Sequence, residues 1–148
     1  MSDCPELDIA IALADELPKV QQLPVRRVYN ALQSLEALKP GDVQLWVAPA
    51  SDDIELGARR IFDHEIAVQV VLVCKLKSSQ DVAEMDDLVR KLSKLKQLWL
   101  AEDGPLRETD LAGAEFKLLT NSPLWEQEVL FKYKVFFARL TLTYWIES

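Results

Sequence analysis

Histidine and acidic side chains are the groups best able to carry acid–base chemistry, and this chain has few places where they could act together. Its single histidine, His64, would have to serve any mechanism of the Ser-His-Asp or Cys-His type. His64 lies in a β-prone segment, on the inward face by period-two counting, as is typical of a hydrogen-bonded strand histidine near the rim of a sheet. We therefore predict no catalytic residue and no enzymatic activity.

Two pairs of neighbouring aspartates could contribute to a cation site. Asp52 with Asp53, and Asp86 with Asp87, offer carboxylate oxygens, but a calcium or magnesium site needs several more ligands that converge. The first pair fits a solvated loop and the second a solvated helix face. We predict no metal site.

The cysteines and glycines do not indicate a cofactor site. Cys4 and Cys74 have neither CxxC spacing nor a His-rich neighbourhood, so we expect reduced thiols in a cytosolic setting. The four glycines, at positions 41, 57, 104 and 113, cannot form a GxGxxG or Walker-type loop around a phosphate. We predict that the protein uses no cofactor.

Large apolar and aromatic side chains lie in or beside polar segments. Ile54 and Leu56 stand among acidic residues, and Trp125 follows a Ser-Pro-Leu sequence. Such residues either cover the ends of the domain's own core or anchor a protein interface. Arg59 and Arg60 form either a local ion pair or a clamp between subunits. We predict an oligomer or partner interface at these five residues.

Two segments have the apolar periodicity of helices, residues 4–17 and residues 80–99. A proline at position 18 begins the connector that follows the first of these helices. In the second segment acidic residues precede basic ones, which complements the helix dipole. We expect its apolar stripe to pack on a sheet; the stripe includes Leu88, Leu92 and Leu95.

Outside these two helices the chain contains several β-prone segments, which are separated by residues typical of loops. The longest, residues 60–76, runs from a polar rim into a stretch that is apolar on both faces. Pro49 ends another alternating run, and residues 50–60 mix acidic with apolar side chains, so we predict a projecting loop there. The predicted strands cover residues 25–29, 43–47, 60–76, 115–120 and 129–146.

The order of elements predicts an α+β fold with a mainly antiparallel sheet and two principal helices packed on one face. A chain of 148 residues with 49% hydrophobic residues can bury a sizeable core, and we expect a single domain over residues 1–148.

Charge and hydropathy exclude two classes of partner. The formal net charge of -7 disfavours tight binding to a phosphate backbone. The acidic N-terminal segment is unlike an export signal, and the longest apolar stretch, residues 66–76, is much shorter than the ~20 residues of a membrane span. We expect a soluble protein without a membrane partner.

The segments follow one another in a recognisable succession that covers nearly the whole chain. After the N-terminal helix come VRRVY at 25–29, VQLWVAP at 43–49, the Arg59-Arg60 pair and FDHEIAVQV at 62–70. The helix at 80–99 and KVFFARLTLTY at 134–144 complete it. In this order the chain resembles the tail terminator, or tail-completion, proteins of long-tailed bacteriophages.

The resemblance implies a structural virion protein without catalytic residues or cofactor. Such a subunit forms a ring, usually of six copies, that caps the tail tube, ends its polymerisation and docks to the head-tail connector protein. It is assembled in the host cytoplasm, and double-stranded DNA passes through its lumen without specific binding. An acidic protein suits such a conduit, because a lumen that bound phosphates tightly would hinder passage.

Other functions remain open at the level of sequence. Another head-tail neck or connector component would share the small size and the assembly role. A monomeric regulatory or small-ligand binding module is a candidate from a different class, and an enzyme that uses His64 with nearby carboxylates is a third. The mass of the protein in solution separates the ring from the monomeric candidates.

Overall fold

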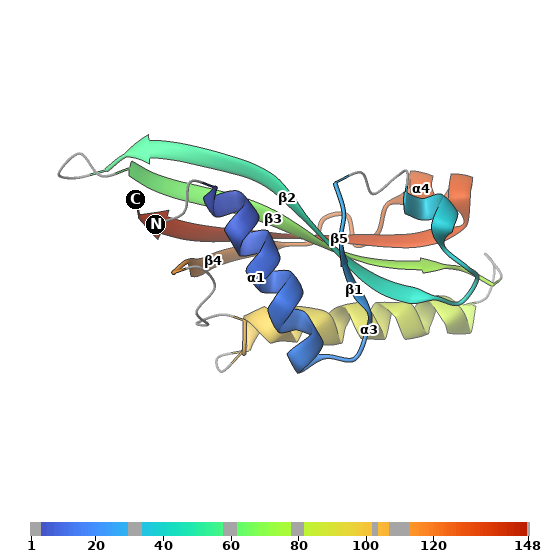
Figure 1. The fold of residues 1–148 in the computed structure, drawn as a ribbon. Coiled ribbons are helices and arrows are strands. Elements are labelled where there is room, and N and C mark those ends of the chain that lie inside the picture. Colours follow the sequence, from blue (N-terminus) through green and yellow to red (C-terminus); the bar gives the residue numbers. More distant parts are fainter. Residues whose placement is uncertain are drawn as a thin grey trace.

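The computed structural model describes residues 4–29, 34–57, 62–77, 82–101, 104–106 and 113–147, which form one sheet with helices packed against it (Figure 1). The elements in chain order are α1 (Pro5–Val20), β1 (Val25–Arg27), the 3-10 helix η1 (Leu35–Ala37), β2 (Val43–Leu56), β3 (Phe62–Lys75), α3 (Val82–Leu100), β4 (Glu115–Thr120), α4 (Gln127–Tyr133) and β5 (Val135–Glu147).

The five-stranded sheet that these residues build has the order β1-β2-β3-β5-β4. β1 pairs with β2 in parallel, whereas the β2–β3, β3–β5 and β4–β5 pairs are antiparallel. The predicted α+β class with a mainly antiparallel sheet is therefore confirmed. β2 and β3 form the longest hairpin, which pairs Val43 with Cys74 at one end and Leu56 with Phe62 at the other.

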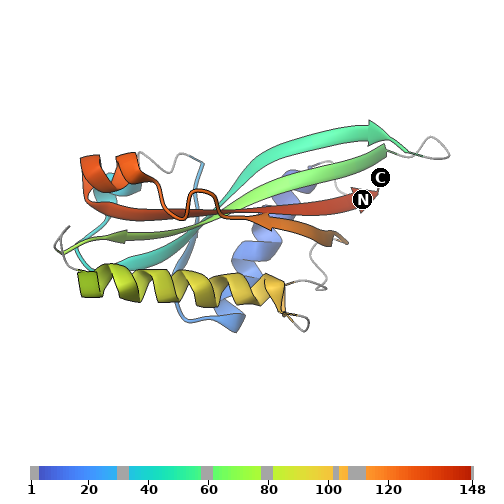
Figure 2. The same ribbon diagram turned by 180° about the vertical axis from the view of Figure 1, so that it is seen from behind.

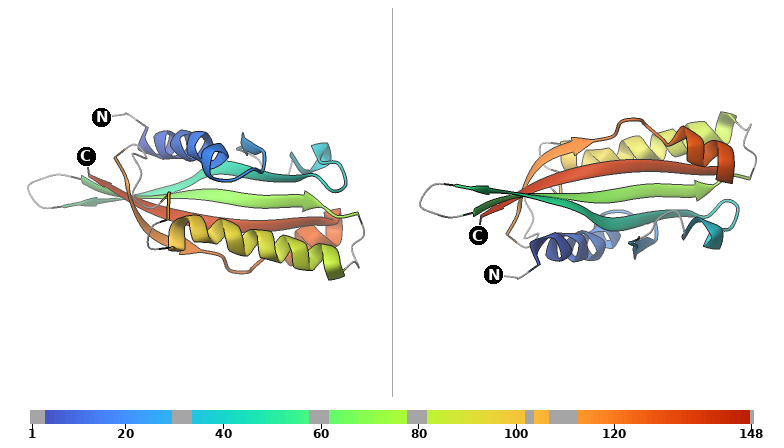
Figure 3. Two further views of the ribbon diagram at one scale, coloured as in Figure 1. Left: turned by 90° about the horizontal axis from the view of Figure 1, so that it is seen from below. Right: turned by 90° about the horizontal axis from the view of Figure 1, so that it is seen from above.

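The main core is one hydrophobic cluster of buried side chains from the sheet, α1 and α3. Even-numbered side chains of β3 and β5, from Ile66 to Cys74 and from Phe136 to Tyr144, share a single hydrophobic cluster with buried side chains of α1 and α3. The predicted stripe of Leu88, Leu92 and Leu95 is buried in this cluster. α1 contacts β1 to β3, whereas α3 contacts β4 and β5, and the sheet between them is twisted (Figure 3).

A smaller core covers part of the opposite face. Val71, Val73 and Phe137 point to this side and pack with Trp46 beneath Leu35 of η1. The second half of β3 is therefore buried on both faces, as the change in its hydrophobic pattern predicted. Its first four residues, from Phe62 to Glu65, are exposed or half-buried.

The predicted helix end before Pro18 is wrong, because α1 continues to Val20. A proline in the last turn removes one backbone hydrogen bond. Beyond the proline, Gln21 satisfies the Leu17 carbonyl at the helix end, because its backbone N–H and its side-chain Nε2 both donate to it, each at 3.1 Å. Leu17 is itself fully buried, so packing also holds the last turn.

The predicted strand over 129–146 is correct only from Val135 onward, because residues 127–133 form the helix α4. Val129 and Leu130 pack on the two hydrophobic clusters, and this packing overrides the β propensity of the segment. The helix ends at Lys134, whose φ of 57° places it in the left-handed region.

The predicted loop over 50–60 is also wrong for most of its length. β2 passes through Pro49 and continues to Leu56, and each residue from Ser51 to Leu56 has a partner in β3. A register shift between Pro49 and Ser51 marks a bulge, which accommodates a residue that cannot donate a backbone hydrogen bond. The segment is therefore the far end of a long hairpin.

Candidate functional site

The far end of the β2–β3 hairpin holds two of the five predicted interface residues, Ile54 and Leu56. Residues 51–56 of β2 and 62–66 of β3 form what we call the hairpin arm. The arm extends beyond the helices, with the end of β5 beside β3 (Figures 1 and 2). Arg59 and Arg60, which were predicted as part of the same interface, lie outside the described residues.

One face of the arm is apolar and exposed. Residues directly opposite each other in an antiparallel pair lie on the same face, so Ile54, paired with His64, and Leu56, paired with Phe62, share one surface. The exposed fractions are 56% for Ile54, 65% for Leu56 and 48% for Phe62. Phe62 was not among the predicted interface residues, because only the pairing of the strands places it beside Leu56.

The other face of the arm is acidic. Asp53 lies opposite Glu65 and Glu55 lies opposite Asp63, so four carboxylates share this face. Lys117 of β4 forms an ion pair with Glu65, whose carboxylate raises the pKa of that lysine. The excess negative charge makes this face repel polyanions. The alternating Asp-Ile-Glu-Leu pattern at 53–56 fits such a two-faced strand, although the sequence analysis predicted a loop there.

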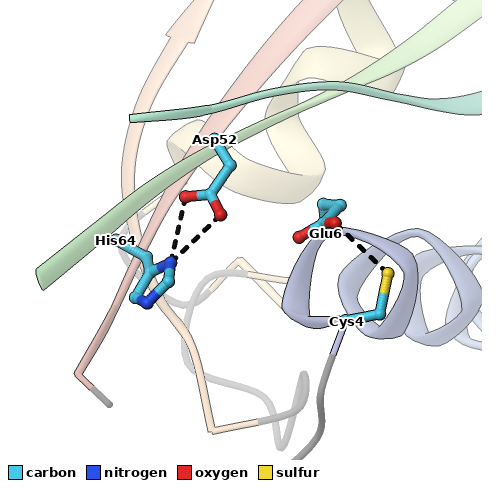
Figure 4. Close-up of polar contacts among 4 residues, drawn as sticks. All are labelled: Cys4, Glu6, Asp52 and His64. Carbon is cyan, nitrogen blue, oxygen red and sulfur yellow. Dashed lines mark hydrogen bonds and ion pairs between the residues drawn. The ribbon is translucent and has the colours of Figure 1, made fainter. Parts of the chain in front are cut away.

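His64 and Asp52 form a polar contact within the apolar face of the arm (Figure 4). His64 Nδ1 lies 3.1 Å from both carboxylate oxygens of Asp52. The two residues are diagonal neighbours, because Asp52 pairs with Ile66 and His64 pairs with Ile54. The contact therefore links β2 to β3 just beyond the bulge.

A carboxylate that orients a histidine is also part of nucleophilic active sites, and Cys4 is the nearby candidate nucleophile. Its thiol instead donates to Glu6 Oε1 at 3.2 Å, and in Figure 4 it points toward Glu6 rather than toward His64. This hydrogen bond is the main reason why the pKa of Cys4 is raised, which disfavours the reactive thiolate. Within the described part of the chain, no three His, Cys, Asp or Glu side chains are placed to hold a metal ion.

Trp125 lies far from the hairpin arm. Its ring centroid is 5.8 Å from that of Phe136, which pairs with Cys74, ten positions along β3 from His64. At about 3.3 Å per residue, ten residues span about 33 Å. Trp125 is half-buried and packs on the main core, so the structure does not bring it together with Ile54 and Leu56.

A groove between α1 and α3 is a second surface feature, and sequence reasoning missed it. The α1–α3 groove has a volume of about 370 Å³ and is lined by Val20, Gln21, Gln22, Leu23, Lys91, Lys94, Leu95 and Leu98. Its walls come from the end of α1 and the side of α3, which no local pattern relates. Lys91 pairs with Asp87 and lowers the pKa of that carboxyl group.

The sequence matches no protein-family model, and no curated protein is significantly similar to it. No helix among the described residues is long and apolar enough to cross a membrane.

Proposed function

We propose that this chain is a structural virion protein of the tail-terminator type. Copies of it form a ring, of six subunits, that caps the tail tube, stops the addition of tube protein and joins the tail to the head connector protein. In this proposal α1 and α3 are the two principal helices that cover one face of each subunit's sheet. The protein acts in the tail or neck of the virion and is assembled in the host cytoplasm.

The observation that carries the proposal is the exposed apolar face of the hairpin arm. Ile54, Leu56 and Phe62 present neighbouring apolar side chains outside the domain's own core. Exposed apolar surface of this kind marks protein interfaces, and the residues lie on a projecting element that can reach a neighbour.

The charge of the molecule supports the same role. The acidic face of the arm and the net charge of -7 allow double-stranded DNA to pass a ring of these subunits without being held. Another neck component would differ from this proposal in its binding partner. A monomeric binding module would differ in its mass in solution.

The test is a double substitution, Ile54→Ser with Leu56→Ser. Both side chains are exposed, so we expect the variant to fold with a denaturation midpoint close to that of the wild type. In a complementation assay of tail assembly we expect over-long tails or tails that fail to join heads.

The control is Val82→Ser with Leu100→Ser, which removes two other exposed apolar side chains, both on α3. This variant should give normal tails. Normal tails from the folded Ile54 and Leu56 variant would remove the argument for the proposed function.

A further inference from the structure

We infer that α4 of one copy docks on the acidic face of the hairpin arm of a second copy. This inference rests on the proposed function, because it names the two surfaces that meet at each contact of the ring. A ring needs an interface of this kind, in which one patch binds a different patch on the neighbour.

The acidic face of the arm keeps carboxylates that its own chain does not neutralise. Asp53 and Glu55 are exposed, and among the described residues neither forms an ion pair. Glu115 of β4 adds a carboxylate to the same face, because it lies opposite Trp145, which in turn lies opposite Glu65. This face therefore favours a partner with positive charge.

A hollow of about 240 Å³ lies on the acidic face. It is lined by Asp53, Glu55, Asp63, Glu65, Lys117 and Trp145. The face of a tryptophan ring attracts cations more strongly than other aromatic rings do, and the carboxylates add to this attraction. A lysine of a partner fits such a surface, because its apolar stem can contact the ring while its ammonium group reaches the carboxylates.

α4 offers the complementary side chains. Phe131 is 90% exposed, the largest exposed fraction among the large hydrophobic residues that the structure describes. Lys132 and Lys134 follow it and are exposed, and in the described part of the chain neither ammonium group forms an ion pair. An aromatic residue beside two lysines matches a hollow that combines a tryptophan with carboxylates.

The positive charge lies at the C-terminal end of α4. Glu128 is in the first turn of this helix and Lys132 in the last. Lys75 lies close to that end, because it pairs with Val135 and because the backbone N–H of the next residue along β3 donates to the Lys134 carbonyl at 2.9 Å. The basic patch therefore combines α4 with the strand ends beside it.

The distance along the sheet makes the contact intermolecular. Trp145 on the acidic face and Val135, which follows α4, are ten positions apart in β5. At about 3.3 Å per residue, ten residues span about 33 Å. The arm and α4 lie at opposite ends of the sheet (Figure 1), so α4 can reach an arm only on another copy.

The contact also suits a ring around DNA. It covers Lys132 and Lys134 with carboxylates, so these lysines are not available to hold phosphates in the conduit. Ile54, Leu56 and Phe62 lie on the other face of the arm and stay available for a further partner.

The experiment measures self-association of the full chain by sedimentation velocity over a range of concentrations. The arm variant is Asp53→Lys with Glu55→Lys, and the α4 variant is Lys132→Glu with Lys134→Glu. We expect each variant alone to associate about tenfold more weakly than the wild type, because like charges then meet at the contact. The chain with all four substitutions should recover association, which a misfolded α4 could not do.

Two controls test whether the effect belongs to these surfaces. Arg27→Glu with Lys94→Glu makes the same charge change as the α4 variant at exposed residues of β1 and α3, and should associate like the wild type. Phe131→Ser should weaken association, whereas Leu100→Ser, at a side chain of α3 that is 51% exposed, should not.

The outcomes separate the contact from the ring. If the wild type, the arm variant and the α4 variant oligomerise equally well, the contact between α4 and the arm is overturned and the ring of the proposed function stands. The same holds if both variants lose association and the chain with four substitutions does not recover it. Where the wild type associates only on tail tubes, co-sedimentation with the tubes compares the same chains. A wild type that stays monomeric at every concentration, and also on tail tubes, overturns both proposals.

Discussion

Cys74 is a buried thiol through which a single residue makes the free energy of unfolding depend on pH. It lies in β3, is 2% exposed and belongs to the main core. Burial raises its pKa from the usual 9.0 to about 11, because the folded protein disfavours the charged thiolate.

We predict that this thiol contributes to the loss of stability at high pH. In the unfolded chain it ionises near pH 9.0, whereas in the folded protein it keeps its proton up to about pH 11. The stabilisation is therefore complete below pH 9.0 and is lost as the pH rises toward 11. Urea denaturation of the wild type and of Cys74→Ala, at pH about 8 and about 10.5, should show a smaller loss in the variant.

Comparing the wild type with Cys74→Ala separates the effect of this thiol from the effects of other groups that ionise at high pH. Burial also raises the pKa of Tyr144, so this residue contributes to the same decline in both proteins. Its hydroxyl group accepts a hydrogen bond from Trp99 Nε1 at 2.8 Å inside the core. Equal losses of stability in the wild type and in Cys74→Ala would show that the thiol plays no part.

At the scale of the element, the stability of α3 depends on its stripe of buried leucines. Leu92 is 1% exposed and contributes to the main core, whereas Leu100 on the same helix is 51% exposed. We predict that Leu92→Ala lowers the free energy of unfolding by about 2 to 5 kcal/mol, because it leaves a cavity.

Leu100→Ala makes the same chemical change on the same helix and should cost less than about 0.5 kcal/mol. Chemical denaturation monitored by the helical circular dichroism signal measures both variants. A denaturation midpoint that Leu92→Ala leaves unchanged would contradict the burial of this helix face.

At the scale of the whole molecule, the long hairpin divides into a core half and a projecting half. Val70 and Leu72 of β3 are fully buried, whereas the paired residues of the arm expose side chains on both faces. We predict that backbone amides of the arm exchange with solvent through local opening, and that those of Val70 and Leu72 exchange only when the whole domain unfolds.

Hydrogen exchange measured in dilute solution tests this division. The free energy of exchange for Val70 and Leu72 should equal the global free energy of unfolding from denaturation, and that for Ile54 and His64 should be lower. Equal protection along the whole of β3 would show that the arm and the core open as one unit.

Local sequence patterns were sufficient to predict a helix or strand where the apolar periodicity of the segment matched the side that it buries. The apolar stripe and ordered charges predicted the helix at 80–99, observed as α3, and the strand over 115–120 is β4. The alternation in residues 60–76 predicted both the strand and its burial on two faces. The mainly antiparallel α+β class followed from the order of these segments.

The same patterns failed where one segment's structure depends on another. Pro49 and the acids at 52, 53 and 55 predict a loop in isolation, and only pairing with residues 62–68 extends β2 through them. Val129 and Phe131 are β-prone, yet the packing of Val129 and Leu130 makes this segment a helix.

The sequence by itself singled out Ile54 and Leu56, because an apolar residue among acids stands out without any knowledge of the fold, but it left open whether they cover the core or face solvent. The tertiary structure decided what surrounds them. Strand pairing added Phe62 and separated an apolar face from an acidic one. The groove lined by α1, the residues that follow it and α3 also depends on the tertiary structure, because these segments are distant in the sequence and become neighbours only in the folded chain.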